Sequence, residues 1–572
     1  MTRNLLLASL VLSLAFPIAA HAQKQMQNSA PDPWWKHAVF YEIYPRSFQD
    51  TNGDGMGDLN GITSRLDYLH DLGVDAIWIA PCFPSPLVDF GYDVSDYDAI
   101  DPQFGTMADM DRLISEAAKR HMHVLLDMVV NHSSDQHPWF IASRSSKTDP
   151  KRDWYIWRDG KVDKDGKMGP PNNWHSVFGG SAWQFDPTTG QYYYHRFFVQ
   201  QPDLNWRNPV VEKAMYDQMR FWLDRGVAGF RLDSIDTLLE DPGLGDEDYR
   251  RDAKGELVRD RTGQPMTTGE KTSNLPEIHD IIRRMRAMID SYPGDRVLVG
   301  ETYLPNVMEL DKWYGGAAKD ELQLPMDTQV GVRNTLNPNL WRTRLEDAET
   351  SLHGSMPLLV YDNHDNSRLD RYCRESNGAA PGADCGQIQK MLETILFTSR
   401  AAAMMYYGDE IGMSTGPMPA EPTRRRDAER TPMQWTQGKN AGFSTGETTW
   451  LPVLPNFTTV NVEVESKDRD SLLEWHRSLI ALRRTNLLLR EGGQKTFSAV
   501  NDNIVAYTRS VGDKQIVVVT NFSGTAQQAD MGALAGRKVH VLQANFAPDM
   551  ANGVLKNSLT LPAYGAFVGE ID

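Results

Sequence analysis

Three acidic residues stand at the ends of short apolar runs of the sequence, where a carboxylate could carry out acid–base chemistry. Asp233 ends the run AGFRLD, Glu301 follows VLVG, and Asp365 ends the run PLLVYDNHD. A single acid at such a place could equally cap a helix or form half of an ion pair. Histidines and an arginine accompany these acids, which argues against coincidence and favours one shared site.

Pairs of carboxylates with unequal pKa values are what cleavage of a glycosidic bond needs. One carboxylate attacks the sugar carbon, while the other is protonated and donates to the leaving oxygen. Arg231 lies two residues before Asp233 and shares its strand face, so its charge should keep Asp233 ionised as a nucleophile. Glu301 follows an apolar segment, where desolvation should raise its pKa toward that of a general acid. Asp365 is then predicted to hydrogen-bond to sugar hydroxyls beside the reacting carbon.

A second pattern is the stretch DTNGDGMGDL at residues 50–59, which alternates oxygen-bearing residues with glycine. Calcium takes about six to eight oxygen ligands from a chain that turns sharply, so this pattern predicts a bound Ca2+. A calcium-sensor loop needs a bidentate Glu at its twelfth position, where this chain has Gly61, so the ion is predicted to be structural. An ion-free turn is the alternative, since Asx-Gly pairs also form ordinary turns. The predicted ligands are Asp50, Asn52, Asp54, the carbonyl of Met56, and Asp58.

The elements that must position these residues alternate between strand-like and helical stretches. Eight apolar runs separated by helices predict an α/β fold, a closed (β/α)8 TIM barrel whose carboxyl-end rim gathers the acids. An open doubly wound sheet is the alternative, but no G-x-G-x-x-G follows any of the runs. The runs are AVFYEIYP, VDAIWIAP, HVLLDMVV, AGFRLD, RVLVGE, ELQLPM, PLLVYDNHD and AAMMYYGDE, with helical stretches at 109–121, 210–226 and 277–292.

The domain organisation follows from where this alternation is interrupted. We assign residues 34–132 and 207–485 to the barrel, and the irregular, Trp-rich residues 133–206 to an inserted small domain after the third strand. Irregular segments of that length inside a domain are usually functional, so the insertion is predicted to wall the site. Alternating strands and turns over residues 490–572 predict a C-terminal all-β sandwich domain.

The first 22 residues have the pattern of a signal peptide, with a basic start, an apolar stretch and the cleavage motif AHA. The protein is therefore expected to be exported, either to the periplasm or as a secreted protein. Cys373 and Cys385 flank a Gly/Pro-rich loop and could form a disulfide, whereas Cys82 is expected to be buried and unpaired. The net charge of −17 argues against nucleic acid or an anionic membrane as a partner.

Four segments in order, DMVVNH, GFRLDSID, VGETY and YDNHD, resemble the signature segments of the α-amylase superfamily of retaining α-glycosidases. QPDLNW, DFGYDVSDY, RTPMQW and the glycine-rich loop resemble its α-glucosidase and oligo-1,6-glucosidase branch, in which that loop holds calcium. The resemblance covers residues 34 to 572. It implies that Asp233 is the nucleophile, Glu301 the acid/base and Asp365 the transition-state stabiliser. The pocket for the terminal glucose would be lined by Asp89, Tyr92, His132, Arg231, His364 and Arg430, with Arg426 a competitor for the last place.

Together with the signal-peptide pattern, the resemblance implies an exported α-glucosidase that acts on short oligosaccharides, and we expect it to be a monomer or homodimer. A transglucosylase or a sucrose/trehalose isomerase on the same scaffold is the alternative, because a sugar acceptor can replace water. A non-catalytic relative is disfavoured, because all three carboxylates are present. In this branch Val after the nucleophile accompanies α-1,6 specificity and smaller residues accompany α-1,4, so Ser234 favours α-1,4 linkages.

Overall fold

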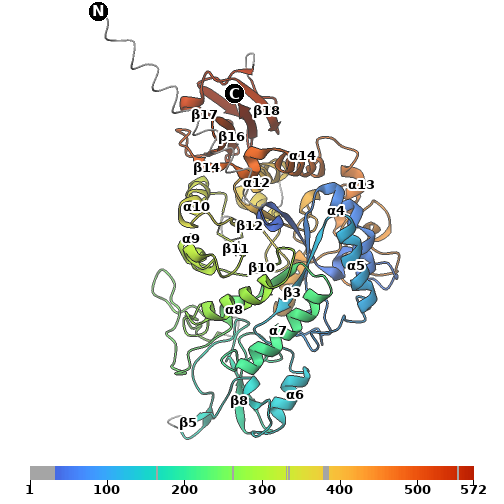
Figure 1. The fold of residues 1–572 in the computed structure, drawn as a ribbon, viewed down its shortest axis with the longest axis vertical. Coiled ribbons are helices and arrows are strands. Elements are labelled where there is room, and N and C mark those ends of the chain that lie inside the picture. Colours follow the sequence, from blue (N-terminus) through green and yellow to red (C-terminus); the bar gives the residue numbers. More distant parts are fainter. Residues whose placement is uncertain are drawn as a thin grey trace, which may run out of the picture. The chain divides into compact units, whose positions relative to one another are not determined.

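Eight parallel strands close into a barrel in the order β1-β13-β12-β11-β10-β9-β3-β2 (Figure 1). This computed structural model describes residues 32–572 except 163–164, 261–262, 330, 333–334, 378–384 and 550–552, so the predicted signal peptide lies outside the described residues. The elements below belong to the body that begins at His37. The barrel strands are β1 (Val39–Ile43), β2 (Ala76–Ile79), β3 (His123–Val129), β9 (Gly229–Asp233), β10 (Val297–Gly300), β11 (Leu324–Asp327), β12 (Leu358–Val360) and β13 (Ala402–Tyr406).

These strands form where the predicted apolar runs lie, and all eight runs are confirmed as barrel strands. Every residue of β1, β2, β10 and β13 is buried, on both faces of the sheet. Burial on both faces explains why the runs are continuously apolar rather than alternating, as is usual for parallel strands covered by helices.

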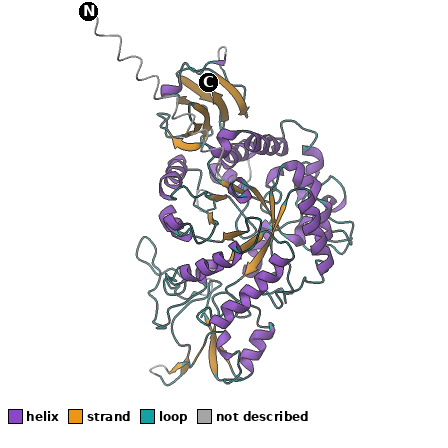
Figure 2. Ribbon diagram, in the orientation of Figure 1, coloured by secondary structure: helices purple, strands orange, loops and turns teal. Residues whose placement is uncertain are grey.

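Helices surround the barrel, as the purple ribbons of Figure 2 show. Helix α5 (Met107–Lys119) begins with a capping box between Thr106 and Asp109, and α7 (Pro209–Asp224) begins with Asn208 as its cap. The predicted helical stretches correspond to α5, α7 and α8 (Ile278–Asp290). The other helices of the barrel region are α2 (Pro45–Phe48), α3 (Leu59–Ser64), α4 (Leu66–Leu72), α9 (Val307–Trp313), α10 (Pro338–Ser351), α11 (Asp370–Asn377), α12 (Cys385–Thr398), α13 (Val462–Glu465), α14 (Leu472–Thr485) and α15 (Leu487–Glu491).

An inserted domain separates β3 from α7, as predicted. It contains α6 (Pro138–Ser145), a sheet of β4 (Trp157–Arg158), β8 (Gln191–Tyr194) and β7 (Trp183–Asp186), and the pair β5 (Lys161–Val162) and β6 (Met168–Gly169). Its small core is aromatic, because Trp174, Trp183 and Tyr194 are buried against one another. In Figure 1 this domain lies at the opposite end of the barrel from the C-terminal strands.

The C-terminal region is an all-β domain of two antiparallel sheets. One has the order β14-β15-β16-β20-β18, and the other pairs β17 with β19. The strands are β14 (Gly493–Thr496), β15 (Ile504–Val511), β16 (Lys514–Asn521), β17 (Gln527–Asp530), β18 (Val539–Ala544), β19 (Ser558–Leu561) and β20 (Ala566–Ile571). Its core faces are apolar, as the predicted alternation requires.

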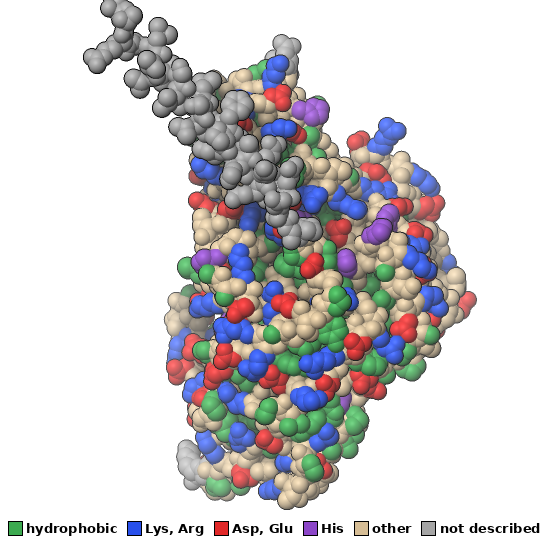
Figure 3. All heavy atoms as spheres, in the orientation of Figure 1, with side chains coloured by type: hydrophobic (Ala, Val, Ile, Leu, Met, Phe, Trp, Pro, Cys, Tyr) green, Lys and Arg blue, Asp and Glu red, His purple; other side chains and the backbone are tan. Residues whose placement is uncertain are grey.

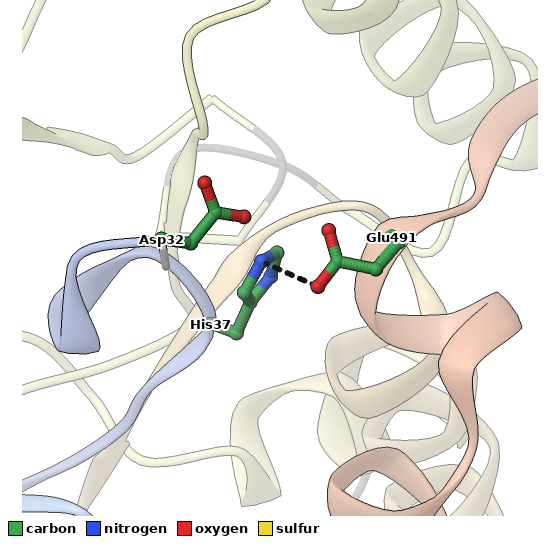
Figure 4. Close-up of side chains that lie close together, drawn as sticks. All are labelled: Asp32, His37 and Glu491. Atoms are coloured by element: carbon green, nitrogen blue, oxygen red, sulfur yellow. Dashed lines mark ion pairs between the residues drawn. The ribbon is translucent and has the colours of Figure 1, made fainter. Parts of the chain in front are cut away.

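A disulfide and an ion pair connect further elements of this body. Cys373 and Cys385 form a disulfide between α11 and α12, while Cys82 is buried and unpaired, as expected. His37, just before β1, forms an ion pair of 3.6 Å with Glu491 at the end of α15 (Figure 4).

On the face seen in Figure 3, acidic and basic side chains are interspersed rather than segregated. Within the described residues, no helix combines the length and apolar character needed to span a bilayer.

Candidate active site

The predicted site residues lie at the carboxyl ends of the barrel strands or in the loops that follow them. Arg231 and Asp233 are in β9, Glu301 directly follows β10, and Asp365 follows β12. β9 and β10 are neighbours with Leu232 opposite Gly300, so the sheet register itself brings Asp233 and Glu301 together. The other predicted residues belong to the same hydrogen-bonded cluster, as shown below.

Arg231 is the centre of this cluster and is completely buried. Its Nη1 lies 2.8 Å from Asp233 Oδ1 and 3.0 Å from Asp127 Oδ2, and its Nη2 lies 2.8 Å from Glu301 Oε2. Since two carboxylates contact the two terminal nitrogens of one guanidinium, Asp233 and Glu301 must face the same small space. Asp233 accepts a true hydrogen bond from Arg231, whereas the Glu301 contact lacks hydrogen-bond geometry.

Both of these acids are held away from water, and this changes their acidity. Burial raises the pKa of Asp233 to about 7, and the opposing effect of Arg231 does not cancel it. Burial also raises the pKa of Glu301 to about 7, again against Arg231. The expected rise for Glu301 is therefore present. Arg231 favours ionisation of Asp233, as expected, but burial has the larger effect on the pKa of Asp233. The single charge of Arg231 is shared with Asp127 and Glu301, so it cannot act on Asp233 alone.

The residue after Asp233 turns the chain sharply. Ser234 adopts φ 46° and ψ 38°, the left-handed backbone conformation that residues other than glycine seldom take. In that conformation its N–H donates to Glu301 Oε2 at 3.0 Å. The strained turn thus aims a backbone donor from the end of β9 at the acid that follows β10.

Asp365 differs from the other two acids because two arginines hold it. Arg430 Nη2 lies 2.6 Å and Arg426 Nη1 2.9 Å from its Oδ1. Burial would raise the pKa of Asp365, but the charges of Arg426 and Arg430 outweigh it, and the pKa falls well below its usual range. Asp365 is therefore ionised at neutral pH. An ionised carboxylate can accept hydrogen bonds from sugar hydroxyls and can stabilise a developing positive charge.

The remaining predicted glucose-binding residues form a connected network around these acids. Tyr92 stacks on His364 at 5.3 Å, and its hydroxyl bonds to His364 Nε2 at 2.7 Å and to Asp127 at 2.9 Å. His132 Nε2 lies 3.1 Å from the Tyr92 carbonyl oxygen and 3.1 Å from Gln201 Nε2. Burial lowers the pKa of His132 to about 4 and that of His364 far below its usual value, so both rings are neutral.

The structure adds residues that the sequence analysis did not assign to the site. Arg426 binds Asp89 as well as Asp365, so Arg426 and Arg430 both take part in the site rather than one of them. Spacing along the chain did not indicate this pairing, because Pro422–Glu429 form a 3-10 helix, in which residues four apart do not share a face. Glu42 of β1 holds His364 Nδ1 at 2.5 Å. An acid in the middle of the buried run VFYEI was the clue to it.

The inserted domain contributes side chains to this cluster. Gln201 Nε2 donates to Asp89 Oδ2 at 3.1 Å, and Phe178 lies beneath the guanidinium of Arg426 at 5.3 Å. Phe178 and Phe198 stack at 4.0 Å. Aromatic rings offer apolar faces, and amide and carboxylate groups can form hydrogen bonds with the hydroxyls of a sugar.

The predicted calcium ligands lie in the loop between α2 and α3. The Asp50 carboxylate accepts hydrogen bonds from the backbone N–H groups of Asn52, Gly53 and Gly55, and Asn52 Oδ1 accepts one from Asp54 N. Asp54 and Asn52 are exposed, and their side chains lie 3.1 Å apart.

Asp58 differs from the other predicted calcium ligands because it is engaged in folding contacts. Its Oδ1 accepts from Gly61 N, which caps α3, and both of its oxygens accept from Thr51. Among the described residues, Asp50, Asp54 and Asp58 do not have ligand oxygens that all lie within 4.8 Å of one another.

Comparison with known proteins gives consistent matches along the chain. Residues 42–492 match the alpha amylase catalytic domain, and residues 495–568 match the maltogenic amylase C-terminal domain. An oligo-1,6-glucosidase of Parageobacillus thermoglucosidasius is 38% identical over 535 residues, covering 86% of this chain and 90% of that protein.

Two solved structures are 34% identical to this chain, and each comparison covers 95% of this chain and 100% of the other. They are the α-glucosyl transfer enzyme XgtA, with a TM-score of 0.85, and the isomaltulose synthase from Erwinia rhapontici NX5, with a TM-score of 0.84.

Proposed function

The chain belongs to the α-amylase family of glycoside hydrolases, and on that premise we propose that it is a retaining α-glucosidase that releases terminal glucose from short oligosaccharides. The observation that carries the proposal is the joint ion pairing of Asp233 and Glu301 with Arg231 at the ends of neighbouring strands. Retaining glycosidases need two carboxylates that flank one glycosidic bond at close range.

In the proposed first step, Asp233 attacks the anomeric carbon and forms a glycosyl ester, while Glu301 gives its proton to the leaving oxygen. In the second step, Glu301 takes a proton from water, the oxygen of that water attacks the same carbon, and the ester bond breaks. Two inversions retain the α anomer, and Glu301 ends with its proton restored. Asp365, ionised between Arg426 and Arg430, supports the positive charge that develops on the sugar in each step.

The mechanism needs an ionised Asp233 and a protonated Glu301, and the charges around the site suit this arrangement. One arginine faces three buried acids, Asp127, Asp233 and Glu301, so the cluster favours retention of a proton. The hydrogen bond from Arg231 to Asp233 favours ionisation of Asp233 and leaves the proton for Glu301.

For linkage, we propose a preference for α-1,4-linked substrates such as maltose, because Ser234 is small and follows the nucleophile. The relative named above is an oligo-1,6-glucosidase, so isomaltose is the competing substrate. Transfer to a sugar acceptor is the second candidate activity, since two of the similar structures are an α-glucosyl transfer enzyme and an isomaltulose synthase.

We also propose a structural Ca2+ at residues 50–58. Asp50, Asn52, Asp54 and the Met56 carbonyl supply hard oxygen donors along one turn, which is the donor type that Ca2+ prefers. Asp58 fits less well, since its two oxygens already hold the start of the loop and the cap of α3. The bound ion would supply positive charge that draws these oxygens together.

Export to the periplasm or medium is proposed from the signal-peptide pattern of residues 1–22. The disulfide between Cys373 and Cys385 supports it, because such bonds persist in oxidising compartments.

Product analysis tests the proposed activity and linkage preference. The purified enzyme would be incubated separately with maltose, isomaltose, sucrose and trehalose, and glucose, transfer products and isomers would be quantified by chromatography. Glucose from maltose as the dominant product supports the proposal. New disaccharides in place of glucose would assign the chain to the transferases or isomerases, and faster release from isomaltose would reverse the linkage preference.

A further inference from the structure

A segment remote in sequence packs along the glycine-rich loop. Residues 443–450 lie against residues 50–58, and Ser444 Oγ donates to Asp50 Oδ2 at 2.5 Å. Gly55 adopts φ +91°, and a Cβ there would fall 2.3 Å from a backbone carbonyl oxygen of the segment. The loop and the segment therefore fit each other closely and are expected to order together.

Trp450 ends this segment and is anchored to the loop. Its backbone N–H donates to the Gly55 carbonyl oxygen at 3.0 Å, and its indole Nε1–H donates to Ser47 Oγ at 3.0 Å. Two bonds fix both the main chain and the ring plane of a half-buried tryptophan, so the ring has a defined orientation.

Tyr44 connects Trp450 to the candidate active site by ring stacking. The rings of Trp450 and Tyr44 stack at 6.0 Å with an interplanar angle of 27°, and Tyr44 in turn stacks on His364 at 6.0 Å. The guanidinium of Arg430 lies 5.1 Å from the Tyr44 ring. Tyr44 is thus packed between Trp450 and two residues of the proposed glucose pocket.

Phe90 forms a second connection between Trp450 and the same pocket. The Trp450 and Phe90 rings lie 6.0 Å apart, and the Arg46 guanidinium lies 5.4 Å from the Trp450 ring and 5.9 Å from the Phe90 ring. Phe90 has φ 47°, a conformation that a bulky side chain keeps only when its surroundings hold it. The residue held in place next to it is Asp89, which binds Arg426 and Gln201.

We propose that Trp450 is a positioning residue that couples the order of the 50–58 loop to the glucose-binding pocket. The inference rests on the proposed function, because it assigns the pocket to glucose. Both contact paths end at Asp89, His364 and Arg430, and neither ends at Asp233 or Glu301. The coupling should therefore act on sugar affinity far more than on the bond-breaking step.

The first test replaces the ring and measures affinity and turnover separately. Trp450→Ala should raise the KM for maltose and the Kd for the glucose-shaped inhibitor 1-deoxynojirimycin by about three- to tenfold, the equivalent of one aromatic pair. The kcat should stay within about twofold, by the same reasoning about contact paths. Trp450→Phe keeps the stacking and should restore most of the affinity.

The second test asks whether the effect comes from the loop. Asp54→Ala should weaken inhibitor binding in the wild-type background but have little further effect in the Trp450→Ala background, because the connection is already broken. Independent, additive losses in the double variant would overturn the proposed coupling.

A matched control separates positioning from stability. Trp475 of α14 makes a comparable indole hydrogen bond to the Lys390 carbonyl oxygen of α12, and among the described residues it forms no ring contact with Tyr44 or Phe90. Trp475→Ala should lower the melting temperature without changing inhibitor affinity. If Trp450→Ala behaves in the same way, the positioning role is wrong. If the wild type fails to bind the inhibitor at all, the proposed function has failed instead.

Discussion

Asp233 is expected to oppose the stability of the fold at neutral pH, because the reaction needs an ionised carboxylate in a buried place. Its pKa is about 7 in the folded protein, against 3.8 as the ordinary value. A carboxyl whose folded pKa is raised binds its proton more tightly when folded, so the associated stability is present at low pH and is lost as pH rises through about 7. From that difference, ionisation of Asp233 destabilises the fold by roughly 4 kcal/mol at pH 8 but by less than about 2 kcal/mol at pH 5.

The perturbation that reveals this cost is Asp233→Asn, which removes the charge and keeps the shape. Turnover should fall by more than about a hundredfold, because an amide cannot form the glycosyl ester. The variant should also be more stable than the wild type, with an advantage that grows by roughly 2–3 kcal/mol between pH 5 and pH 8. Urea unfolding at both pH values, followed by circular dichroism, measures this directly.

Asp365→Asn is the matched control, because the structure predicts the opposite sign. The charges of Arg426 and Arg430 depress the pKa of Asp365 against the effect of burial. Its ionised form therefore stabilises the fold above pH 4, and that contribution should change little between pH 5 and pH 8. Asp365→Asn should lose stability by a similar amount at both values. An Asp233→Asn variant that is no more stable at pH 8 than the wild type would refute the reasoning about burial.

Three further predictions concern the acid, the stereochemistry and the loop. Glu301→Gln should severely slow glycosylation of the enzyme by maltose. The first step should stay nearly normal for a nitrophenyl glucoside, because its leaving group needs no proton. Equal loss of the pre-steady-state burst on both substrates contradicts the acid role. Polarimetry should show α-glucose as the first product, and β-glucose would exclude a retaining mechanism. Chelation of Ca2+ or Asp54→Ala should lower the melting temperature, while kcat stays nearly constant. An ion present at a hundredfold excess over its Kd stabilises the fold by roughly 2.7 kcal/mol, and its removal loses that amount. A kcat that follows calcium at constant melting temperature would make the ion regulatory.

Much of the fold is already determined by local sequence. Runs such as VFYEI and AIWI are apolar on both faces, and this pattern suits strands that helices cover on one side and a packed barrel interior on the other. The order of those runs, and the acids that end them, predicted the barrel and the gathering of Asp233, Glu301 and Asp365 at one rim. These are consequences of chain direction and strand period, which are local properties.

The electrostatics of the site were decided only by tertiary structure. Spacing paired Arg231 with Asp233, but the fold adds Asp127 and Glu301 to the same guanidinium and buries the whole cluster, so the effect of burial on the pKa of Asp233 exceeds that of Arg231. Likewise, Arg426 reaches Asp89 from a segment 337 residues away in sequence. How one charge is divided depends on every group within a few ångströms of it and on how much water is excluded, and neither quantity is written in the spacing of residues along the chain.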